Sequence, residues 1–221
     1  MTTPWTVPRD WPGETVAILA SGPSMAREQA EACRGKCRVI AVNNQGIDTD
    51  CEVNGVKTRQ PAFAPWADVL FAADLKWWRH YADRSLKFAG LKVMVGHRRN
   101  YPEIFSLELS QTVKVFDPRP SHIVSGGNSG YMAMHLAAHF GVKRMLLCGF
   151  DMREGPRNRR HWFGNHPGLL NSKARFSGWI HAMDRLAKVF KERHIEVVNC
   201  STNTALRCFK RTSIEDALRG S

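Results

Sequence analysis

Residues 123–152 form the part of this chain whose residue types are best suited to hold an anionic ligand. A turn of small residues, SGGNSG at 125–130, opens a helix-like run, and an apolar segment at 145–148 ends in Gly149-Phe150-Asp151. Backbone N–H groups at the start of a helix attract anions. A carboxylate just beyond a strand lies where open α/β sheets bind their ligands. The pattern is therefore typical of a ligand-binding α/β protein.

A second turn of this kind follows the first apolar run. Residues 16–20 read VAILA, the profile of a strand buried on both faces, and Gly22, Pro23 and Ser24 come soon after it. Pro23 suits a turn or a first helical position, and Ser24 suits the cap of the helix that follows. The turn is neither GxGxxG nor a P-loop. On these residues alone, a purely structural strand-to-helix turn is an equal alternative.

The charge of the chain points to an anionic partner. Its 221 residues include 32 Lys and Arg against 20 Asp and Glu, a net charge of +12. Four arginines fall within residues 153–160, REGPRNRR, beside Trp162. Such a segment suits nucleic acid, a phosphorylated substrate or an acidic glycan. A solvated basic surface is the alternative.

Several classes of protein are not expected. No apolar run approaches the roughly 20 residues that span a membrane, and the first 14 residues do not resemble a signal peptide, so we expect a cytoplasmic protein without membrane contact. The six cysteines lack zinc-finger spacing, which argues against a structural metal or a disulfide scaffold. His135 and His139 share a helix face without the Glu of HExxH, so packing is expected rather than metal binding.

Alternating elements predict the fold class. Strands are expected near 16–20, 38–42, 69–72, 91–95, 113–116, 144–148 and 195–199, and helices near 24–33, 75–83, 129–140, 174–193 and 213–219. This alternation implies an α/β fold with a mostly parallel, Rossmann-like sheet and helices on both faces. We expect one domain over residues 15–221, an irregular arm at 1–14, and a basic, lid-like loop at 152–173.

Two motifs carry a resemblance to a known family. ILASGPSM (18–25) and GGNSGYMAMHLAAHFGVKRMLLCGFDM (126–152) resemble segments of the bacterial sialyltransferases typified by the Campylobacter lipooligosaccharide enzymes. The wider superfamily includes the flagellin-modifying motility accessory proteins and the archaeal hydroxymethylpterin pyrophosphokinase. AVNNQG (41–46), HWFGNH (161–166) and NCSTNTALRCF (199–209) also fit, so the resemblance spans most of residues 16–210. It implies sugar transfer from a CMP- or UDP-type nucleotide donor to a hydroxyl.

The resemblance and the chemistry of the residues together suggest a nucleotide site at the strand ends. The two turns would present N–H and hydroxyl donors to a phosphate, the asparagines would bond a base or ribose edge, and the carboxylates would hold a ribose hydroxyl or a metal. For the asparagines a turn role, and for the carboxylates a capping role, are the alternatives. The expected residues are Gly22, Pro23, Ser24, Asn43, Asn44, Asp74, Ser129, Gly130 and Asp151.

His161 is the expected general base, and His166 is the second candidate. The resemblance puts His161 where the sialyltransferases keep their base histidine, and neighbouring arginines would lower its pKa and favour the neutral form. The tyrosines that support the departing phosphate in that family have no counterpart in DMREGPRNRR (151–160). Arg153 or Arg157 would neutralise this charge instead. The departure leaves the identity of the donor open.

Two other functions remain open. One is a magnesium-dependent pyrophosphokinase of the pterin type, for which Asp74, Asp151 and Glu154 would supply ligands, although nothing in the sequence requires magnesium. The other is a nucleic-acid-binding protein without activity, or a phage-type enzyme that modifies DNA, suggested by the charge. For the transferase we expect an anionic acceptor, with DNA as one alternative, and leave a homo-oligomer open.

Overall fold

The computed structural model describes residues 5–53, 56–96, 101–164, 166, 170 and 174–220, apart from the side chains of 52, 53, 56 and 57. The strands are β1 (Thr15–Leu19), β2 (Arg38–Val42), β3 (Thr49–Val53), β4 (Val56–Gln60), β5 (Val69–Phe71), β6 (Leu91–Val95), β7 (Phe105–Leu109), β8 (His122–Ile123), β9 (Arg144–Cys148), β10 (Glu196–Asn199) and β11 (Lys210–Arg211). The helices are α1 (Arg27–Cys33), α2 (Leu75–His80), α3 (Ala82–Ser85), α4 (Ser129–Phe140), α5 (Phe176–Glu192) and α6 (Ile214–Arg219), with 3-10 turns η1 (Asn43–Gln45) and η2 (Pro156–Asn158).

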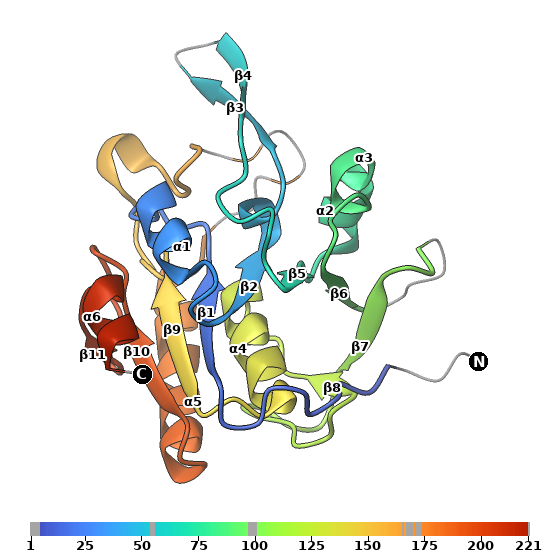
Figure 1. Cartoon of the computed structure of the whole chain (residues 1–221), viewed down its shortest axis with the longest axis vertical. Coiled ribbons are helices and arrows are strands. Elements are labelled where there is room, and N and C mark those ends of the chain that lie inside the picture. The colour runs from blue at the N-terminus through green and yellow to red at the C-terminus, as the bar shows by residue number, and fades with distance from the viewer. Residues whose placement is uncertain are drawn as a thin grey trace.

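A parallel sheet forms the centre of the molecule (Figure 1). In the described residues its order is β11-β10-β9-β1-β2-β5-β6-β7-β8. The antiparallel hairpin β3-β4 projects from the body (Figure 1). From β1 the chain first builds the sheet toward β8 and then returns to place β9 on the other side of β1. The predicted α/β class with a parallel sheet is confirmed, and the strand order reverses between β1 and β9.

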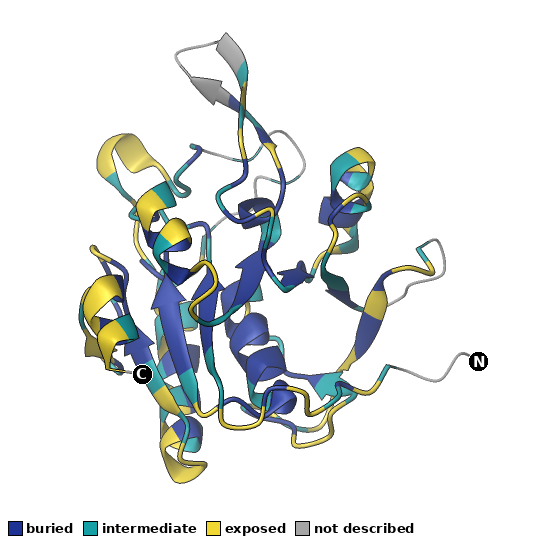
Figure 2. Ribbon diagram, in the orientation of Figure 1, coloured by how far each residue is buried: buried dark blue, intermediate teal, exposed yellow. Residues whose placement is uncertain are grey.

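Both faces of the sheet are covered, which explains the continuous apolar strands. In β1, Val16 and Ile18 face the core that α4 and α5 complete, whereas Ala17 and Leu19 face the core under α1, α2 and α6. The central strands are accordingly dark blue in Figure 2. A strand with helices on both sides has no solvent face, so its sequence shows no polar alternation.

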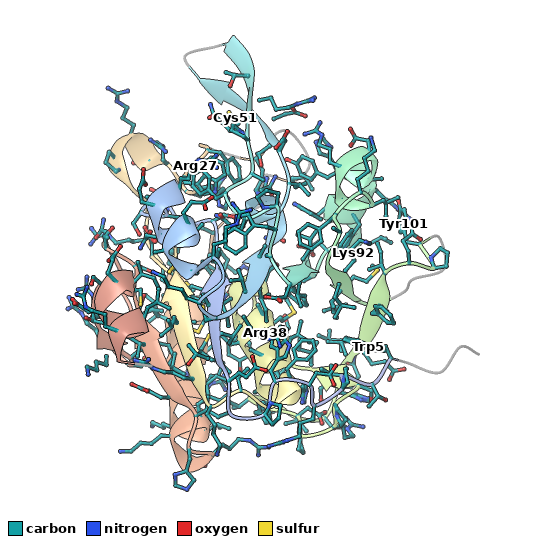
Figure 3. All side chains as sticks on the ribbon, viewed as in Figure 1. Trp5, Arg27, Arg38, Cys51, Lys92 and Tyr101 are labelled. Atoms are coloured by element: carbon teal, nitrogen blue, oxygen red, sulfur yellow. The ribbon has the colours of Figure 1, made fainter. Side chains whose placement is uncertain are left out.

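Helix α4 is buried on nearly all sides. Ten of its twelve residues are buried, including His135 and His139. The N-terminal arm covers it: Trp11 stacks on Phe140 with ring centroids 4.1 Å apart. Farther along this arm, Trp5 packs on β7 (Figure 3). A helix that is apolar all round must be enclosed, and the irregular arm supplies the missing layer.

The predicted strand at 113–116 is wrong, and the sheet uses β7 and β8 in its place. Phe116 packs instead on His135, with ring centroids 4.2 Å apart, and the Val115 carbonyl accepts a hydrogen bond from the Tyr131 hydroxyl. The N–H of Val124 donates to Nδ1 of the same His135 ring, at 3.1 Å. Both histidines therefore pack as expected. The apolar side chains of 113–116 are covered by packing on α4, without strand hydrogen bonds.

Two predicted helices also differ from the structure. The helix expected at 24–33 begins at Arg27, with Ala26 at its N-cap position. The helix expected at 75–83 is divided into α2 and α3 at the fully buried Tyr81, whose backbone leaves the helical region. Neither the β3-β4 hairpin nor the short β11 was predicted. Tertiary packing around Tyr81 decided the break, because the local sequence there favours continuous helix.

The ends of β1 and β9 approach each other more closely than side chains permit. The N–H of Gly22 donates to the Gly149 carbonyl at 3.0 Å, and that of Ala20 donates to the Cys148 carbonyl at 2.8 Å. A Cβ on Gly149 would lie 2.2 Å from the Ala20 carbonyl oxygen, and the φ of Gly149 is +71°. Glycine is therefore required at position 149 by both space and backbone conformation.

We expect Gly149→Ala to destabilise the protein by about 3 kcal/mol, the sum of left-handed strain and overpacking. Gly13→Ala is the matched control, because Gly13 also has a positive φ (+78°) but a Cβ there meets nothing within 4 Å. The control should cost only about 1 kcal/mol. Urea unfolding measures the free energy of unfolding of both variants. Equal decreases would show that the close contact with Ala20 adds nothing to the cost of the substitution.

Candidate functional site

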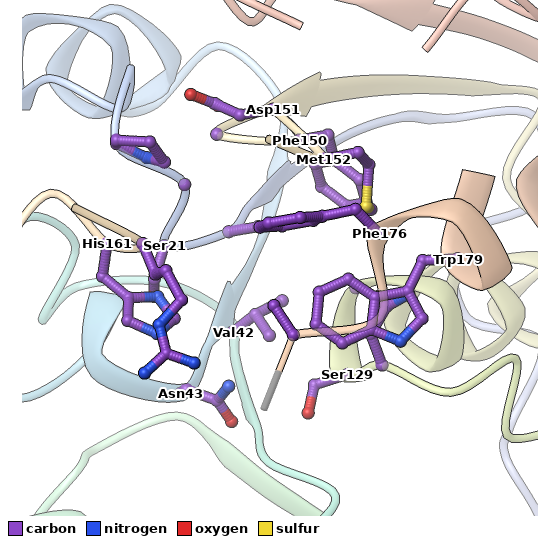
Figure 4. A pocket seen from close by; sticks show the side chains of 18 of the residues that line it. Ser21, Val42, Asn43, Ser129, Phe150, Asp151, Met152, His161, Phe176 and Trp179 are labelled. Carbon is purple, nitrogen blue, oxygen red and sulfur yellow. The ribbon is translucent and has the colours of Figure 1, made fainter. Parts of the chain in front are cut away.

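A cavity of about 240 Å³ opens at the carboxyl ends of β1, β2 and β9 (Figure 4). This is the point where the strand order reverses, the usual ligand position in open α/β sheets. The cavity is also lined by the first residues of α4 and α5 and by the loop after β9. The predicted residues that line it are Gly22, Pro23, Asn43, Asp74, Ser129, Gly130, Asp151, Arg153 and His161.

Two helix N-termini meet at this cavity. At the start of α4, the Asn128 side chain accepts a hydrogen bond from the Tyr131 N–H at 2.9 Å, and Ser129 and Gly130 line the cavity. Phe176, the first residue of α5, lines it from another direction. The first N–H groups of a helix have no partner within the helix and carry partial positive charge. Arg153 and Arg160 add full charges to the lining, so the site is suited to an anion.

The glycines of the two turns are needed for packing within the protein. A Cβ on Gly22 would lie 2.3 Å from the Gly149 carbonyl oxygen, and one on Gly130 would lie 2.9 Å from the Phe150 ring. Large substitutions at either glycine would disturb the fold before they reported on a ligand. Ser129 also lines the cavity and already carries a side chain, so it is the better position for testing phosphate binding.

Asp151 connects the end of β9 to the turn that follows β1. Its carboxylate accepts hydrogen bonds from the Ser24 N–H at 2.8 Å and from the Ser24 hydroxyl at 2.7 Å. In Figure 4 this carboxylate points away from the other labelled side chains. Burial raises the pKa of Asp151 to about 6, although the Ser24 bonds and Arg153 oppose the shift. Ser24 does not appear in the lining, whereas Asp151 does, so this pair fixes the turn after β1 to the end of β9 at the edge of the cavity.

The three residues of η1 have different positions. Asn43 lines the cavity and has a left-handed backbone, with φ of 54°. Asn44 is fully buried and accepts a hydrogen bond from the Trp77 indole at 2.9 Å. Gln45 donates to the Ala20 carbonyl at 2.9 Å and so ties β2 to β1. Only Asn43 of the two predicted asparagines is placed to contact a ligand.

Asp74 occupies the N-cap position of α2, but its side chain makes no capping hydrogen bond. It is exposed and lines the cavity. The carboxylate is therefore available to a ligand, in contrast to that of Asp151.

His161 is presented by a tight turn in the loop after β9. The backbones of His161 and Gly164 exchange two hydrogen bonds, each 3.0 Å, and the His161 ring stacks on Phe163 at a centroid distance of 5.1 Å. The ring of His166 lies 4.6 Å away, and Figure 4 shows His161 beside Ser21. Burial, and then the charge of Arg160, lower the pKa of His161 to about 4, while a hydrogen bond to the Ser21 backbone opposes them. The imidazole is therefore neutral at neutral pH.

The described part of this loop contacts the body of the protein at three points. The Trp162 N–H donates to the Ser21 carbonyl at 3.1 Å, and the Trp162 ring stacks on Phe63 with centroids 3.8 Å apart. A Cβ on Gly155 would lie only 2.7 Å from the Pro23 ring, so the loop also rests on that turn. These contacts hold His161 at the cavity; closure of the loop over a ligand stays a prediction.

Arg157 is not among the lining residues. It lies on the exposed turn η2, where its φ is +56°. The expectation that Arg157 meets a phosphate therefore finds no support in this arrangement, whereas Arg160, three residues later, lines the cavity. The order of residues alone does not tell which arginines of this segment face the cavity, because the directions of their side chains depend on how the loop folds.

Several lining residues were not predicted, and His166 was only the second candidate for the base. Among the described residues, three buried polar atoms of the lining have no hydrogen-bond partner: Ser21 Oγ, Asn128 Nδ2 and His166 Nδ1. Leaving such an atom unpaired costs about 1–3 kcal/mol, so these atoms mark places where a ligand or water would bind. Asn128 could have been found as the residue before a helix start. Phe176 and Trp179 contribute aromatic rings to the lining. Their spacing in the sequence is the same as that of helix residues that face a hydrophobic core, so no local pattern identifies them.

Within the described ranges, no group of three or more His, Cys, Asp or Glu is arranged to hold a metal ion. The six cysteines are all free thiols.

None of the helices in the part of the chain that the structure describes has the length and apolarity needed to cross a membrane.

Comparison with known proteins supports the fold. Neither protein-family models nor curated proteins match the sequence. Among solved structures, the MAf glycosyltransferase from Magnetospirillum magneticum AMB-1 has a TM-score of 0.59 at 15% identity, over 96% of this chain and 36% of that one. The sialyltransferase CstII from Campylobacter jejuni, solved with the substrate analogue cytidine-5'-monophosphate, has a TM-score of 0.50 at 15% identity, over 90% of this chain and 85% of that one.

The chain thus spans 36% of the length of the first of these proteins. At this level of identity the likeness shows a shared fold. It confirms the fold that the motif resemblance implied, a parallel α/β fold also used by two glycosyltransferases.

The raised pKa of Asp151 predicts a pH-dependent stability. Because the folded state holds this proton more tightly than the unfolded state, the stabilisation is complete below the unfolded pKa and is lost as the pH rises through the folded pKa of about 6. Relative to Asp151→Asn, the wild type should lose about 3 kcal/mol between about pH 3 and about pH 7, and nothing more above that. Urea unfolding of both proteins at four pH values gives this difference, and a constant difference would contradict the shift.

The lowered pKa of His161 predicts the charge state of the free protein. We expect the Hε1 resonance of His161, assigned by comparison with His161→Gln, to titrate near pH 4 rather than 6.5. A His161 midpoint close to 6.5 would show that the ring is hydrated and that Arg160 does not act on it.

Proposed function

We propose that this protein is a glycosyltransferase that moves a sugar from a nucleotide-activated donor to a hydroxyl group. The observation that carries the proposal is the position of a neutral histidine, His161, beside a cavity onto which the N-termini of α4 and α5 converge. The two structural neighbours are glycosyltransferases, and one of them was solved with cytidine monophosphate. These likenesses support a CMP- or UDP-type donor.

The donor's phosphate would bind at the start of α4. Ser129 and Gly130 offer N–H groups and a hydroxyl, and Arg153 and Arg160 supply positive charge. Asn43, whose left-handed backbone turns it into the cavity, would bond the ribose or the base. Asn128 Nδ2, buried without a partner, would donate to an oxygen of the donor.

His161 would act as the general base. The acceptor hydroxyl attacks the anomeric carbon, its proton passes to an imidazole nitrogen, and the bond from that carbon to the phosphate oxygen breaks. A histidine with a pKa near 4 is a weak base in the free protein. The negative charge of a bound donor beside it would raise this pKa, because a nearby anion favours the imidazolium. Binding of the donor would thus make His161 a stronger base.

The arginines would replace the tyrosines that the resemblance leads one to expect. As the sugar leaves, negative charge grows on the phosphate, and Arg153 and Arg160 are the cationic residues that line the cavity. Charge-assisted hydrogen bonds of this kind stabilise a departing phosphate. No cation has to be supplied by Arg157.

A pyrophosphokinase would place a greater demand on the carboxylates. Of the two predicted ones in the lining, Asp151 has both oxygens engaged by Ser24, which leaves Asp74. We find no observation that favours this reaction over sugar transfer. Strict magnesium dependence with ATP as the donor would nevertheless identify it.

The test begins with a thermal-shift panel of CMP, UDP, GDP and ATP, followed by release of nucleotide from the corresponding sugar donors. We expect CMP or UDP to raise the Tm, since a ligand of the folded state stabilises it. With the sugar donor thus identified, His161→Ala should lower kcat by about 10²–10⁴ and leave the nucleotide Kd nearly unchanged.

His181→Ala, an exposed histidine on α5, is the control and should keep full activity. His161→Gln provides a second variant in case the alanine protein is unstable. A folded His161 variant with wild-type turnover would overturn the mechanism, and the absence of any nucleotide effect would overturn the donor.

A further inference from the structure

A second hollow lies next to the cavity. It is an open groove of about 630 Å³, and it shares Gly127 and Trp179 with the cavity lining. A Cβ on Gly127 would lie 3.0 Å from the Trp179 ring, so the indole rests directly on this glycine. Gly127 and Trp179 thus form the boundary between the two spaces. A molecule held in the groove would enter the cavity past Trp179, which in Figure 4 lies across the cavity from His161.

One face of α5 forms a wall of the groove. Arg175, Gly178, Trp179, Ala182 and Arg185 recur at intervals of three and four residues, so they share that face. Gly178 and Ala182 have small side chains and leave space in the middle of this face, and Arg175 and Arg185 lie at its two ends. Glycine weakens a helix relative to alanine, yet a Cβ on Gly178 would meet nothing within 4 Å. Internal packing therefore gives no reason for this glycine, whereas an open groove does.

The charge of the groove is of one sign. Lys114, Arg175 and Arg185 line it, and none of the described lining residues is a carboxylate. Within the described part of the chain these three side chains form no ion pair, whereas Arg38, Arg84 and other arginines elsewhere are paired with Asp or Glu. Like charges gathered without a counter-charge repel one another, so the groove is electrostatically complementary to an anion.

We propose that this groove holds the acceptor of the proposed transferase, and that it selects a saccharide that carries a phosphate or a carboxylate. The acceptor role rests on the proposed function, whereas binding of the acidic saccharide does not. The arginines would hold the acidic group, because their planar guanidinium groups match phosphate and carboxylate oxygens. The Trp179 indole offers an apolar face on which a sugar ring can pack.

The extent of the charge favours a saccharide over a nucleic acid. Three cations around a short groove match one or two acidic groups. A nucleic acid usually takes a longer basic track, with several phosphates contacted. An acidic saccharide also reaches the cavity with a hydroxyl group, which the proposed reaction requires.

Calorimetric titration of the full chain with glucose 6-phosphate, glucuronate and glucose tests the proposal. We expect both acidic probes to bind at least about 10-fold more tightly than glucose, and Arg175→Gln/Arg185→Gln to weaken them about 10- to 100-fold, as expected for the loss of two charge-assisted hydrogen bonds. Lys188→Gln/Lys191→Gln is the matched control: it removes two charges from the same helix at positions that do not line the groove, and its effect should stay below about 3-fold.

Gly178→Leu tests the space independently of charge. Because a Cβ there meets nothing, the variant should fold with unchanged or higher Tm, keep the nucleotide-induced thermal shift, and bind glucose 6-phosphate at least about 10-fold more weakly.

Equal affinity for glucose and for the acidic probes, or equal losses in the two double variants, would overturn the proposal. A single-stranded oligonucleotide that binds with the same arginine dependence, without binding of either acidic sugar, would assign the groove to nucleic acid and overturn the saccharide. A nucleotide-induced thermal shift without binding of acidic sugars would contradict the proposed acceptor groove but not the proposed donor. Binding of acidic sugars without any nucleotide effect would contradict the proposed nucleotide donor but not the groove.

Discussion

The close approach of the ends of β1 and β9 is the constraint on which the site depends. Gly22 donates to the Gly149 carbonyl, and a side chain at either position would collide with the opposite strand end. The Asp151 carboxylate then closes the contact through two hydrogen bonds to Ser24. Because these strands flank the point where the sheet order reverses, this junction also forms the floor of the cavity. Substitutions at the junction would therefore alter fold and site together.

Desolvation governs the chemistry of the groups around that floor. It raises the pKa of Asp151 and lowers the pKa of His161, so burial disfavours the charged form of each. Positive charge in the lining comes from the N-termini of α4 and α5 and from Arg153 and Arg160, whereas Asp74 and Asp151 carry the negative charge. Past Trp179, the described lining of the groove has three cationic side chains and no carboxylate. In the proposed function, the cavity would hold the nucleotide-bound sugar and the neighbouring groove would hold the acidic acceptor.

Much of the fold was predictable because the signals were local. The continuous apolar runs of β1 and β9 and the helix between Asn128 and Gly141 each depend on residues close in sequence, and all three were found. The strand expected at 113–116 failed because its apolar residues pack on α4, and no local pattern tells a strand from an extended segment that packs through side chains.

For the site, the order of strands and turns along the chain was enough to predict which residue types gather at the strand ends, because turns after buried strands must lie at one edge of a parallel sheet. The directions of these side chains came from the three-dimensional packing. It turned Asn43 into the cavity and Asn44 into the core, paired Ser24 with Asp151 across 127 positions of sequence, and brought Arg160 rather than Arg157 to the lining. Those outcomes depend on contacts between segments far apart in the chain, whose geometry no local spacing encodes.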